Sequence, residues 1–181
     1  MARLPYVQPA DSAEPHRIER IYSEIRGMGR EVLNLYQVLA NQPNALEAFL
    51  SMSRYIRDDS SLRPEIREIA ILATARALDQ GYEIAHHRGA ALRAGVAQVK
   101  IDSILAGAPG DLEPVERAVV GYALQVARDR SVDDATFAEL KSWLSDAAIT
   151  DLVLTVAWYH LCAAVLGPLQ VELEVEERNA R

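Results

Sequence analysis

Residues 64–95 read PEIREIAILATARALDQGYEIAHHRGAALRAG. The first half of this segment, 64–80, is apolar at most positions, which predicts a helix buried on most of its sides. Gly81 ends or kinks that helix, strong helix formers then run from Tyr82 to Ala94, and Gly95 supplies a C-terminal cap. The segment therefore predicts a helical hairpin at the centre of the fold.

Helical periodicity continues on both sides of this hairpin. It predicts helices over 14–26, 44–56, 97–105, 114–130, 133–144 and 146–165, while 33–39 forms a short apolar turn. Ser60 or Ser61 is expected to cap the first helix of the hairpin, and Gly167 with Pro168 to stop the last helix. No stretch shows the two-residue alternation of a β-strand. The predicted fold class is all-α, with about eight helices.

Length and composition indicate one domain that spans residues 1–181 and has a mass of 20.0 kDa. Pro5, Pro9 and Pro15 predict an irregular arm over 1–15, which either wraps a neighbouring subunit or frays. Residues 172–181 are highly charged and are expected to fray. The arm contains no apolar segment of a secretory signal, and no apolar run approaches the roughly 20 residues that span a bilayer. A membrane protein is therefore not expected.

The charge and the cysteine content exclude several classes of protein. A formal net charge of -7 gives no electrostatic support to nucleic-acid binding. The single cysteine, Cys162, can form neither an internal disulfide, nor a four-thiolate zinc site, nor a redox dithiol. A cytoplasmic location is the simplest expectation.

Two helix openings are similar and lie 50 positions apart, Leu62-Arg-Pro-Glu-Ile-Arg67 and Leu112-Glu-Pro-Val-Glu-Arg117. Each opening precedes an alanine-rich apolar helix, which indicates an internal duplication. Because proline is a common residue in the first turn of a helix, two unrelated helices could share this opening.

The residues best suited to chemistry lie in the second helix of the hairpin. Glu83 and His87 are four positions apart and therefore share a helix face, and Glu68 on the preceding helix could face them. A carboxylate beside an imidazole favours the imidazolium and orients the ring, as proton transfer near neutral pH requires. The alternative is a solvated Glu–His pair without catalytic function.

Other kinds of site have less support in the sequence. A metal site made of Glu68, Glu83, His86 and His87 is possible, but adjacent histidines point about 100° apart on a helix and seldom share one ion. We expect no metal and no organic cofactor. His160 lies in an apolar stretch and is expected to be a hydrogen-bonded core residue, and His16 is expected at the surface. The sequence contains no phosphate-binding glycine loop, nucleophile elbow or His-Glu-x-x-His motif.

Residues 34–166 resemble the carboxymuconolactone decarboxylase family, which includes the alkylhydroperoxidase D proteins. The peroxidase branch has a Glu, eleven further residues and then Cys-x-x-Cys-x-x-x-His. This pattern places the glutamate on Glu68, the cysteines on Gln80 and Glu83, and the histidine on His87. The decarboxylase branch has Glu-x-x-x-His followed by Ala-Leu-Arg-x-Gly-Val, which corresponds here to 83–87 and 91–96. The similarity to the decarboxylase branch is the closer one.

This resemblance implies an alkylhydroperoxidase D-like helical domain and a cofactor-free lyase that decarboxylates a small carboxylated lactone or β-keto acid. His87 would be the general acid, and Glu83 or Glu68 would set its protonation. A small-molecule carboxylic acid would contact substrate-binding residues, expected to be Gln80, His86, Arg88 and Arg93. Peroxidase activity is not expected because both thiols of that route are replaced.

The resemblance also implies a homo-oligomer, a trimer or a hexamer. The alternative function is that of a non-catalytic family member, in which Glu68, Glu83 and His87 form a satisfied buried network between helices.

Overall fold

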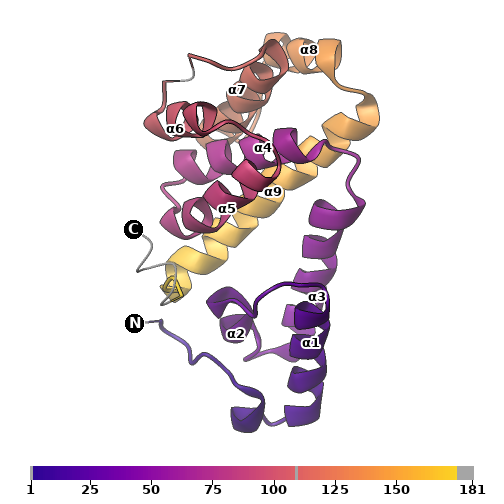
Figure 1. Cartoon of the computed structure of the whole chain (residues 1–181), viewed down its shortest axis with the longest axis vertical. Helices are drawn as coiled ribbons and strands as arrows, with labels where there is room; N and C mark the ends of the chain where they lie inside the picture. Colours follow the sequence, from indigo (N-terminus) through magenta and orange to yellow (C-terminus); the bar gives the residue numbers. More distant parts are fainter. Residues whose placement is uncertain (1, 109, 175–181) are drawn as a thin grey trace. The chain divides into compact units, whose positions relative to one another are not determined.

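The computed structural model describes residues 2–108 and 110–174 (Figure 1). Over these ranges the chain forms nine α-helices and no β-strand, which confirms the all-α class. The ninth helix is α2, Asn34–Leu39, where the sequence predicted only an apolar turn. The chain divides into two compact units, Met1–Asp58 with Leu166–Arg181 (unit 1) and Asp59–Val165 (unit 2). A single domain over 1–181 stays a prediction.

Unit 1 is built from α1 (Pro15–Gly27), α2 and α3 (Pro43–Arg54), and α3 continues into a π-helical turn at Tyr55–Asp59. Both α1 and α2 pack against α3. The buried face of α1 is the predicted apolar stripe, since it consists of Ile18, Ile21, Tyr22 and Ile25. Hydrophobic burial of this stripe therefore accounts for the position of α1 in the unit.

The N-terminal arm packs on unit 1. The Val7 amide donates to the Gln37 carbonyl at 3.1 Å, and the buried Tyr22 hydroxyl donates to the Val7 carbonyl at 2.7 Å. Burial of this phenol raises the pKa of Tyr22 to about 12. Before Pro15, the described part of the arm contains one 3₁₀ turn, at Pro9–Asp11. That the arm wraps a neighbouring subunit stays a prediction.

The charged tail that the sequence predicted over 172–181 lies largely outside the described residues. Its first residues contact the start of α2. The Glu172 carbonyl accepts from Asn34 Nδ2 at 2.9 Å, and Glu174 Oε1 accepts from the Asn34 amide at 2.7 Å. Glu172 and Glu174 therefore have hydrogen-bond partners in unit 1.

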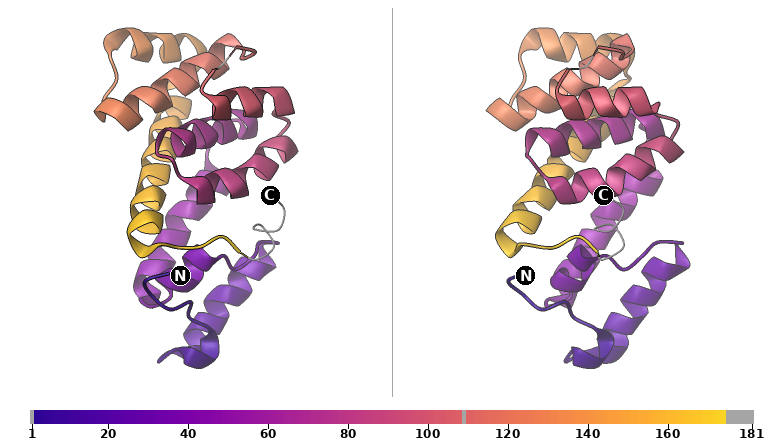
Figure 2. Two further views of the ribbon diagram at one scale, coloured as in Figure 1. Left: turned by 90° about the vertical axis from the view of Figure 1, so that its left-hand side faces the viewer. Right: turned by 60° about the vertical axis from the view of Figure 1, so that its left-hand side comes forward.

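Unit 2 is arranged around α4 (Pro64–Ala77) and contains the predicted hairpin, which Figure 2 shows in two views. α4 packs against α5 (Gly81–Arg93), α6 (Gln98–Ala106) and α7 (Pro114–Asp129), and α7 packs against α8 (Asp134–Trp143). Nine residues of α4 are buried, so the prediction of a helix buried on most sides is confirmed. The core also receives residues of α9 (Asp146–Leu169), among them Ile149, Leu152 and Val156.

The ends of the hairpin helices differ in part from the prediction. Arg63 is the N-cap of α4. Ser61 does not cap this helix, because its amide and its hydroxyl both donate to Asp151 Oδ2, at 2.7 and 2.6 Å. At the end of α5, Gly95 has a φ of +94° and the Val96 amide donates to the Ala91 carbonyl. The predicted glycine cap is therefore confirmed.

α9 is longer than predicted, because it continues through Gly167 and Pro168 to Leu169. By length and composition alone, this 24-residue helix could cross a membrane, so the expectation that no segment is long and apolar enough is wrong. The core helix of a soluble protein meets the same criterion, and 39% of the apolar window is buried inside the protein. One such helix is weak evidence for a membrane span.

The two helices with similar openings lie against each other. Pro64 and Pro114 each occupy the first position of a helix, and α4 packs against α7 more extensively than any other pair of described helices. Shared ancestry of the two halves stays a prediction.

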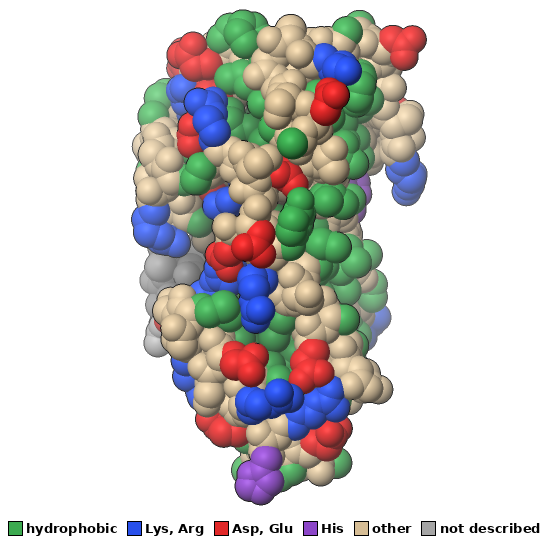
Figure 3. Space-filling model, turned by 90° about the vertical axis from the view of Figure 1, so that its right-hand side faces the viewer, with side chains coloured by type: hydrophobic (Ala, Val, Ile, Leu, Met, Phe, Trp, Pro, Cys, Tyr) green, Lys and Arg blue, Asp and Glu red, His purple; other side chains and the backbone are tan. Residues whose placement is uncertain are grey.

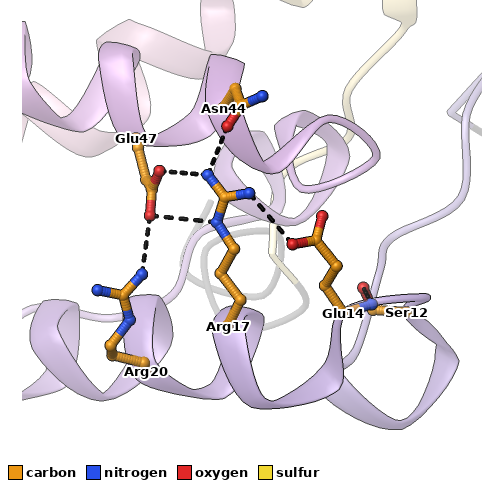
Figure 4. A network of polar contacts seen from close by, with 6 residues as sticks. All are labelled: Ser12, Glu14, Arg17, Arg20, Asn44 and Glu47. Carbon is orange, nitrogen blue, oxygen red and sulfur yellow. Dashed lines mark hydrogen bonds and ion pairs between the residues drawn. The ribbon is translucent and has the colours of Figure 1, made fainter.

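The described surface carries charges of both signs. On the face drawn in Figure 3, blue and red side chains lie next to one another rather than in one large patch of a single sign. In unit 1 a network of this kind is centred on Arg17 (Figure 4). Arg17 Nη2 contacts Glu47 Oε2 at 2.5 Å, and Arg17 Nη1 contacts Glu14 Oε2 at 3.2 Å. The contact with Glu47 joins α1 to α3, whereas Glu14 is the N-cap residue of α1 itself.

Candidate acid–base site

The candidate site is centred on His87, which lies on the buried face of α5. This helix begins at Gly81, directly after the N-cap residue Gln80, whose side chain accepts from the Tyr82 amide at 3.4 Å. Because Glu83 lies one turn before His87, its Oε2 atom is 3.5 Å from His87 Nε2. The predicted Glu83–His87 pair is present, but it is buried rather than solvated.

A second carboxylate reaches the opposite edge of the imidazole. Glu68 projects from α4, and its Oε2 atom lies 2.7 Å from His87 Nδ1. Arg67, the residue before Glu68, places its Nε atom 3.8 Å from Glu68 Oε1. The packing of α4 against α5 therefore brings together the three residues that the sequence predicted as catalytic.

The third partner of His87 comes from α9. The Tyr159 hydroxyl lies 2.9 Å from His87 Nε2, and the two rings meet edge to face with centroids 5.0 Å apart. Tyr159 is thus hydrogen-bonded to a residue 72 positions earlier in the chain. We call Glu68, Glu83, His87 and Tyr159 the His87 network.

All four members of the His87 network are buried, with exposed fractions of 2–6%. A buried polar group is costly unless it is hydrogen-bonded, and both ring nitrogens of His87 have partners. The helices α4, α5 and α9 hold these partners in fixed positions, so the network is preorganised.

The network can accommodate two protonation states of His87 without moving heavy atoms. An ionised Glu68 only accepts hydrogen bonds, so it selects the tautomer that carries hydrogen on Nδ1. In the neutral ring, the lone pair on Nε2 then accepts from the Tyr159 hydroxyl. In the imidazolium, Nε2 donates to the Tyr159 oxygen or to Glu83. A proton at Nε2 can therefore be held or released in place.

A comparison with known families finds a match over part of the chain. Residues 43–125, just under half of the chain, match the model of the carboxymuconolactone decarboxylase family, and this range contains Glu68, Glu83 and His87. The predicted resemblance to this family, which includes the alkylhydroperoxidase D proteins, is thus confirmed. A comparison with the curated proteins finds no sequence match.

Several solved structures share the fold of this chain. An alkylhydroperoxidase AhpD core protein from Ralstonia eutropha JMP134, described as peroxidase-related, has 21% identity and a TM-score of 0.82 over 97% of this chain and 94% of its own. A peroxidase-related protein from Silicibacter sp. TM1040 has 16% identity and a TM-score of 0.83 over 97% and 92%. The debrominase Bmp8, solved with 2,3,4-tribromopyrrole, has 17% identity and a TM-score of 0.80 over 99% and 97%. At these identities the likeness shows the fold alone.

The four residues that were expected to bind substrate occupy different surroundings in the structure. Gln80 is the N-cap of α5, and the half-buried His86 ring packs on Tyr82 with centroids 4.6 Å apart. Arg88 and Arg93 are exposed, and Arg88 forms an ion pair with Asp102 of α6. Substrate binding by these residues stays a prediction.

Tyr159 was not predicted as a site residue, and the prediction for the next residue, His160, differs from the structure. A tyrosine inside an apolar helix is a signal in itself, because a buried hydroxyl needs a hydrogen-bond partner. His160 is half-buried, and its Nε2 has no hydrogen-bond partner among the described residues, so the expectation of a satisfied core histidine is wrong. Burial, followed by the charge of Arg130, lowers the pKa of His160.

A metal site was the other alternative considered for these residues. Within residues 2–108 and 110–174, no group of three or more His, Cys, Asp or Glu side chains is placed to hold a metal ion.

Proposed function

We propose that the protein is a cofactor-free carboxy-lyase that acts on a small carboxylated lactone or β-keto acid, with His87 as its general acid. The observation that carries this proposal is the arrangement of His87 between Glu68 Oε2, 2.7 Å from Nδ1, and the Tyr159 hydroxyl, 2.9 Å from Nε2. The family match supports the same reaction class, because it covers the three acid–base residues of α4 and α5.

The proposed reaction needs one proton and no redox change. The bond between the substrate carbon and its carboxylate breaks, carbon dioxide leaves, and the electron pair moves into the adjacent unsaturated carbonyl as a dienolate. Imidazolium Nε2–H of His87 then protonates carbon, and the neutral ring accepts from Tyr159 until it takes up a new proton. Glu68 keeps hydrogen on Nδ1 during the cycle, so the exchanged proton is always the one on Nε2.

The burial of the network favours a second candidate function. His87 and Tyr159 are 3% and 2% exposed, so a purely structural role between α4, α5 and α9 accounts for the same contacts. In that case the network specifies how these helices pack and turns over no substrate. The two candidates differ in whether His87 exchanges a proton with a substrate.

The deciding experiment incubates the protein with 4-carboxymuconolactone and follows carbon dioxide release. General acid catalysis contributes about 10²–10⁴-fold, so we expect a loss of this size in His87→Gln. The matched control is His16→Gln, which removes an exposed histidine of unit 1 and is expected to keep full activity. Circular dichroism checks that both variants are folded.

Three other results would count against the proposal. Turnover that is unchanged in His87→Gln removes His87 from the mechanism. No release by the folded wild type excludes 4-carboxymuconolactone as substrate. If β-keto acids also fail, the structural role is the better explanation.

We also propose that the protein is a homo-oligomer, a trimer or a hexamer. Large apolar side chains exposed on unit 2 support this proposal, because burying them would stabilise an interface: Leu124, Phe137, Trp143 and Val153 are 39–51% exposed. Sedimentation at micromolar concentration tests it, and a species with the mass of one chain would contradict it.

A further inference from the structure

A pocket of about 190 Å³ lies between α4, α6 and α7 in unit 2, and it is open to solvent on one side, where the exposed residues Arg76, Ala77 and Leu124 line it. The pocket is called the cavity below. Its lining is apolar except for one guanidinium, and it consists of Ala73, Arg76, Ala77, Ile104, Gly107, Val120 and Leu124. An apolar cavity of about 150 Å³ in a protein core can hold a benzene molecule. The space is therefore large enough for a small aromatic or branched aliphatic ligand.

This cavity lies on a different side of α4 from the His87 network. Successive residues of an α-helix are about 100° apart, so Ala73 and Ala77 are about 140° and 180° around α4 from Glu68. Glu68 contacts α5, whereas Ala73 and Ala77 line a space bounded by α6 and α7. A ligand in the cavity would therefore bind at a site separate from His87.

Arg76 gives the cavity its chemical specificity. Its Nε atom donates to the Leu105 carbonyl at 2.8 Å, which fixes the guanidinium beside the cavity. Arg88 and Arg128 of the same unit pair with carboxylates, whereas Arg76 has no ion pair with any residue that the structure describes. Its Nη donors are thus available to a planar anion, and a guanidinium binds a carboxylate through two parallel hydrogen bonds.

We propose that this cavity binds a small apolar carboxylate. The hydrocarbon part of the ligand occupies the space between Ile104, Val120 and Leu124, and its carboxylate pairs with the Nη atoms of Arg76. Apolar burial provides the affinity, and the ion pair selects acids over neutral molecules of the same shape. This site goes beyond the proposed lyase function and does not depend on it.

Titration of the full-length ¹⁵N-labelled protein with sodium benzoate tests the proposal by NMR. We expect saturable shifts of the amides of Ile104, Gly107 and Val120, and at least 10-fold weaker binding of benzamide, which has the same shape without the charge. Sodium acetate at equal ionic strength controls for general salt effects. Since the readout is binding rather than turnover, failure of the lyase proposal would not affect it.

Two variants separate the effect of the Arg76 charge on binding from the effect of the cavity volume. Arg76→Gln keeps a hydrogen-bonding side chain and is expected to weaken benzoate binding at least 10-fold. The matched control is Arg63→Gln, an exposed arginine at the other end of α4, which should bind benzoate like the wild type. Ala77→Leu narrows the cavity at the exposed last residue of α4 and should weaken benzoate and benzamide alike.

Three outcomes overturn the proposal. Equal affinity for benzoate and benzamide shows that Arg76 selects no acid. Equal losses in Arg76→Gln and Arg63→Gln show that binding depends on the net charge of the protein and not on a contact with Arg76. If no amide shift saturates, the cavity does not take up a carboxylate. The same result is expected if a second copy of the chain fills the cavity, and it overturns the proposal in either case.

Discussion

The Arg17 network of unit 1, which consists of Arg17, Glu14 and Glu47, and the His87 network of unit 2 make similar contacts in different surroundings. Each joins two helices through a glutamate: Glu47 of α3 contacts Arg17 of α1, and Glu68 of α4 contacts His87 of α5. The Arg17 network is partly exposed, with 38% of the Glu47 side chain accessible, whereas 9% of the Glu68 side chain is accessible. The same type of contact is therefore solvated in one unit and dehydrated in the other.

This difference determines what each contact contributes. Water can replace the partners of an exposed ion pair, so such a pair adds little to stability. A buried polar group has no such substitute, so removing one partner leaves another group unsatisfied. Substitutions in the His87 network should therefore lower the free energy of unfolding more than substitutions in the Arg17 network. The contribution of the Arg17 network should depend mainly on pH and salt.

The largest expected effect tests the burial of Glu68. Glu68→Ala leaves His87 Nδ1 without its partner, so the free energy of unfolding should fall by about 3–5 kcal/mol. Trp143 and Trp158, the two tryptophans of the chain, lie in unit 2, so their fluorescence during urea unfolding reports on this unit. Glu139→Ala, at an exposed position of α8, is the matched control, and a similar loss there would refute the distinction between buried and exposed carboxylates.

The next effect concerns one hydroxyl group. Tyr159→Phe removes the hydrogen-bond partner of His87 Nε2 and should cost about 1–3 kcal/mol by the same measurement. Tyr122→Phe removes the hydroxyl of another buried ring of unit 2, one for which no hydrogen bond is found among the described residues. It should be nearly neutral. Equal costs would mean that the loss comes from the ring surroundings and not from the bond to His87.

A smaller effect extends the comparison to His160, a dehydrated group without a partner at Nε2. Because its pKa is lowered in the folded state, the unfolded chain takes up a proton first, so stability falls as the pH drops below about 6.5. His160→Leu should reduce the difference between the melting temperatures at pH 8 and pH 5. His16→Leu, at the surface, should leave that difference as it is in the wild type, and a change there equal to that of His160→Leu would contradict the assignment.

The smallest effect is expected in the Arg17 network. The hydrogen bonds from Arg17 lower the pKa of Glu47, so the stabilisation is present above the ordinary glutamate value of about 4.3 and is lost as the pH falls through the lower value. The melting temperature of Glu47→Gln should be slightly lower than that of the wild type at pH 6 and equal to it at pH 2. Far-UV circular dichroism is the suitable probe because both tryptophans lie in unit 2, and a difference at pH 6 that persists in 1 M NaCl would contradict a solvated pair.

Local patterns in the sequence were sufficient to predict most helices. The apolar stripe of α1 and the proline openings of α4 and α7 show that a few neighbouring residues specify where these helices form. The wrong predictions concern residues whose structure depends on the tertiary fold. Ser61 was assigned to a helix cap, but it bonds to Asp151, 90 positions later, and α9 continues through Pro168 although proline usually ends a helix.

The residues of the candidate site were likewise predictable only in part. Glu83 and His87 follow from helical spacing, and Glu68 follows from the hairpin that folds α4 onto α5. Tyr159 could not be placed, because its approach to His87 depends on how α9 packs in unit 2. Periodicity along one chain shows which face of a helix is buried but not which side chain meets it there.

The first turn of α5 has a consequence for oxidative chemistry. Where the peroxidase branch carries its two thiols, α5 has Gln80 as its N-cap and Glu83 in its first turn, and the one cysteine of the chain, Cys162, is buried in α9. Neither an amide nor a carboxylate is oxidised by peroxide along the route that converts thiolates to sulfenic acids. The proton chemistry of His87 should therefore be indifferent to oxidants that would inactivate a thiol enzyme with the same fold.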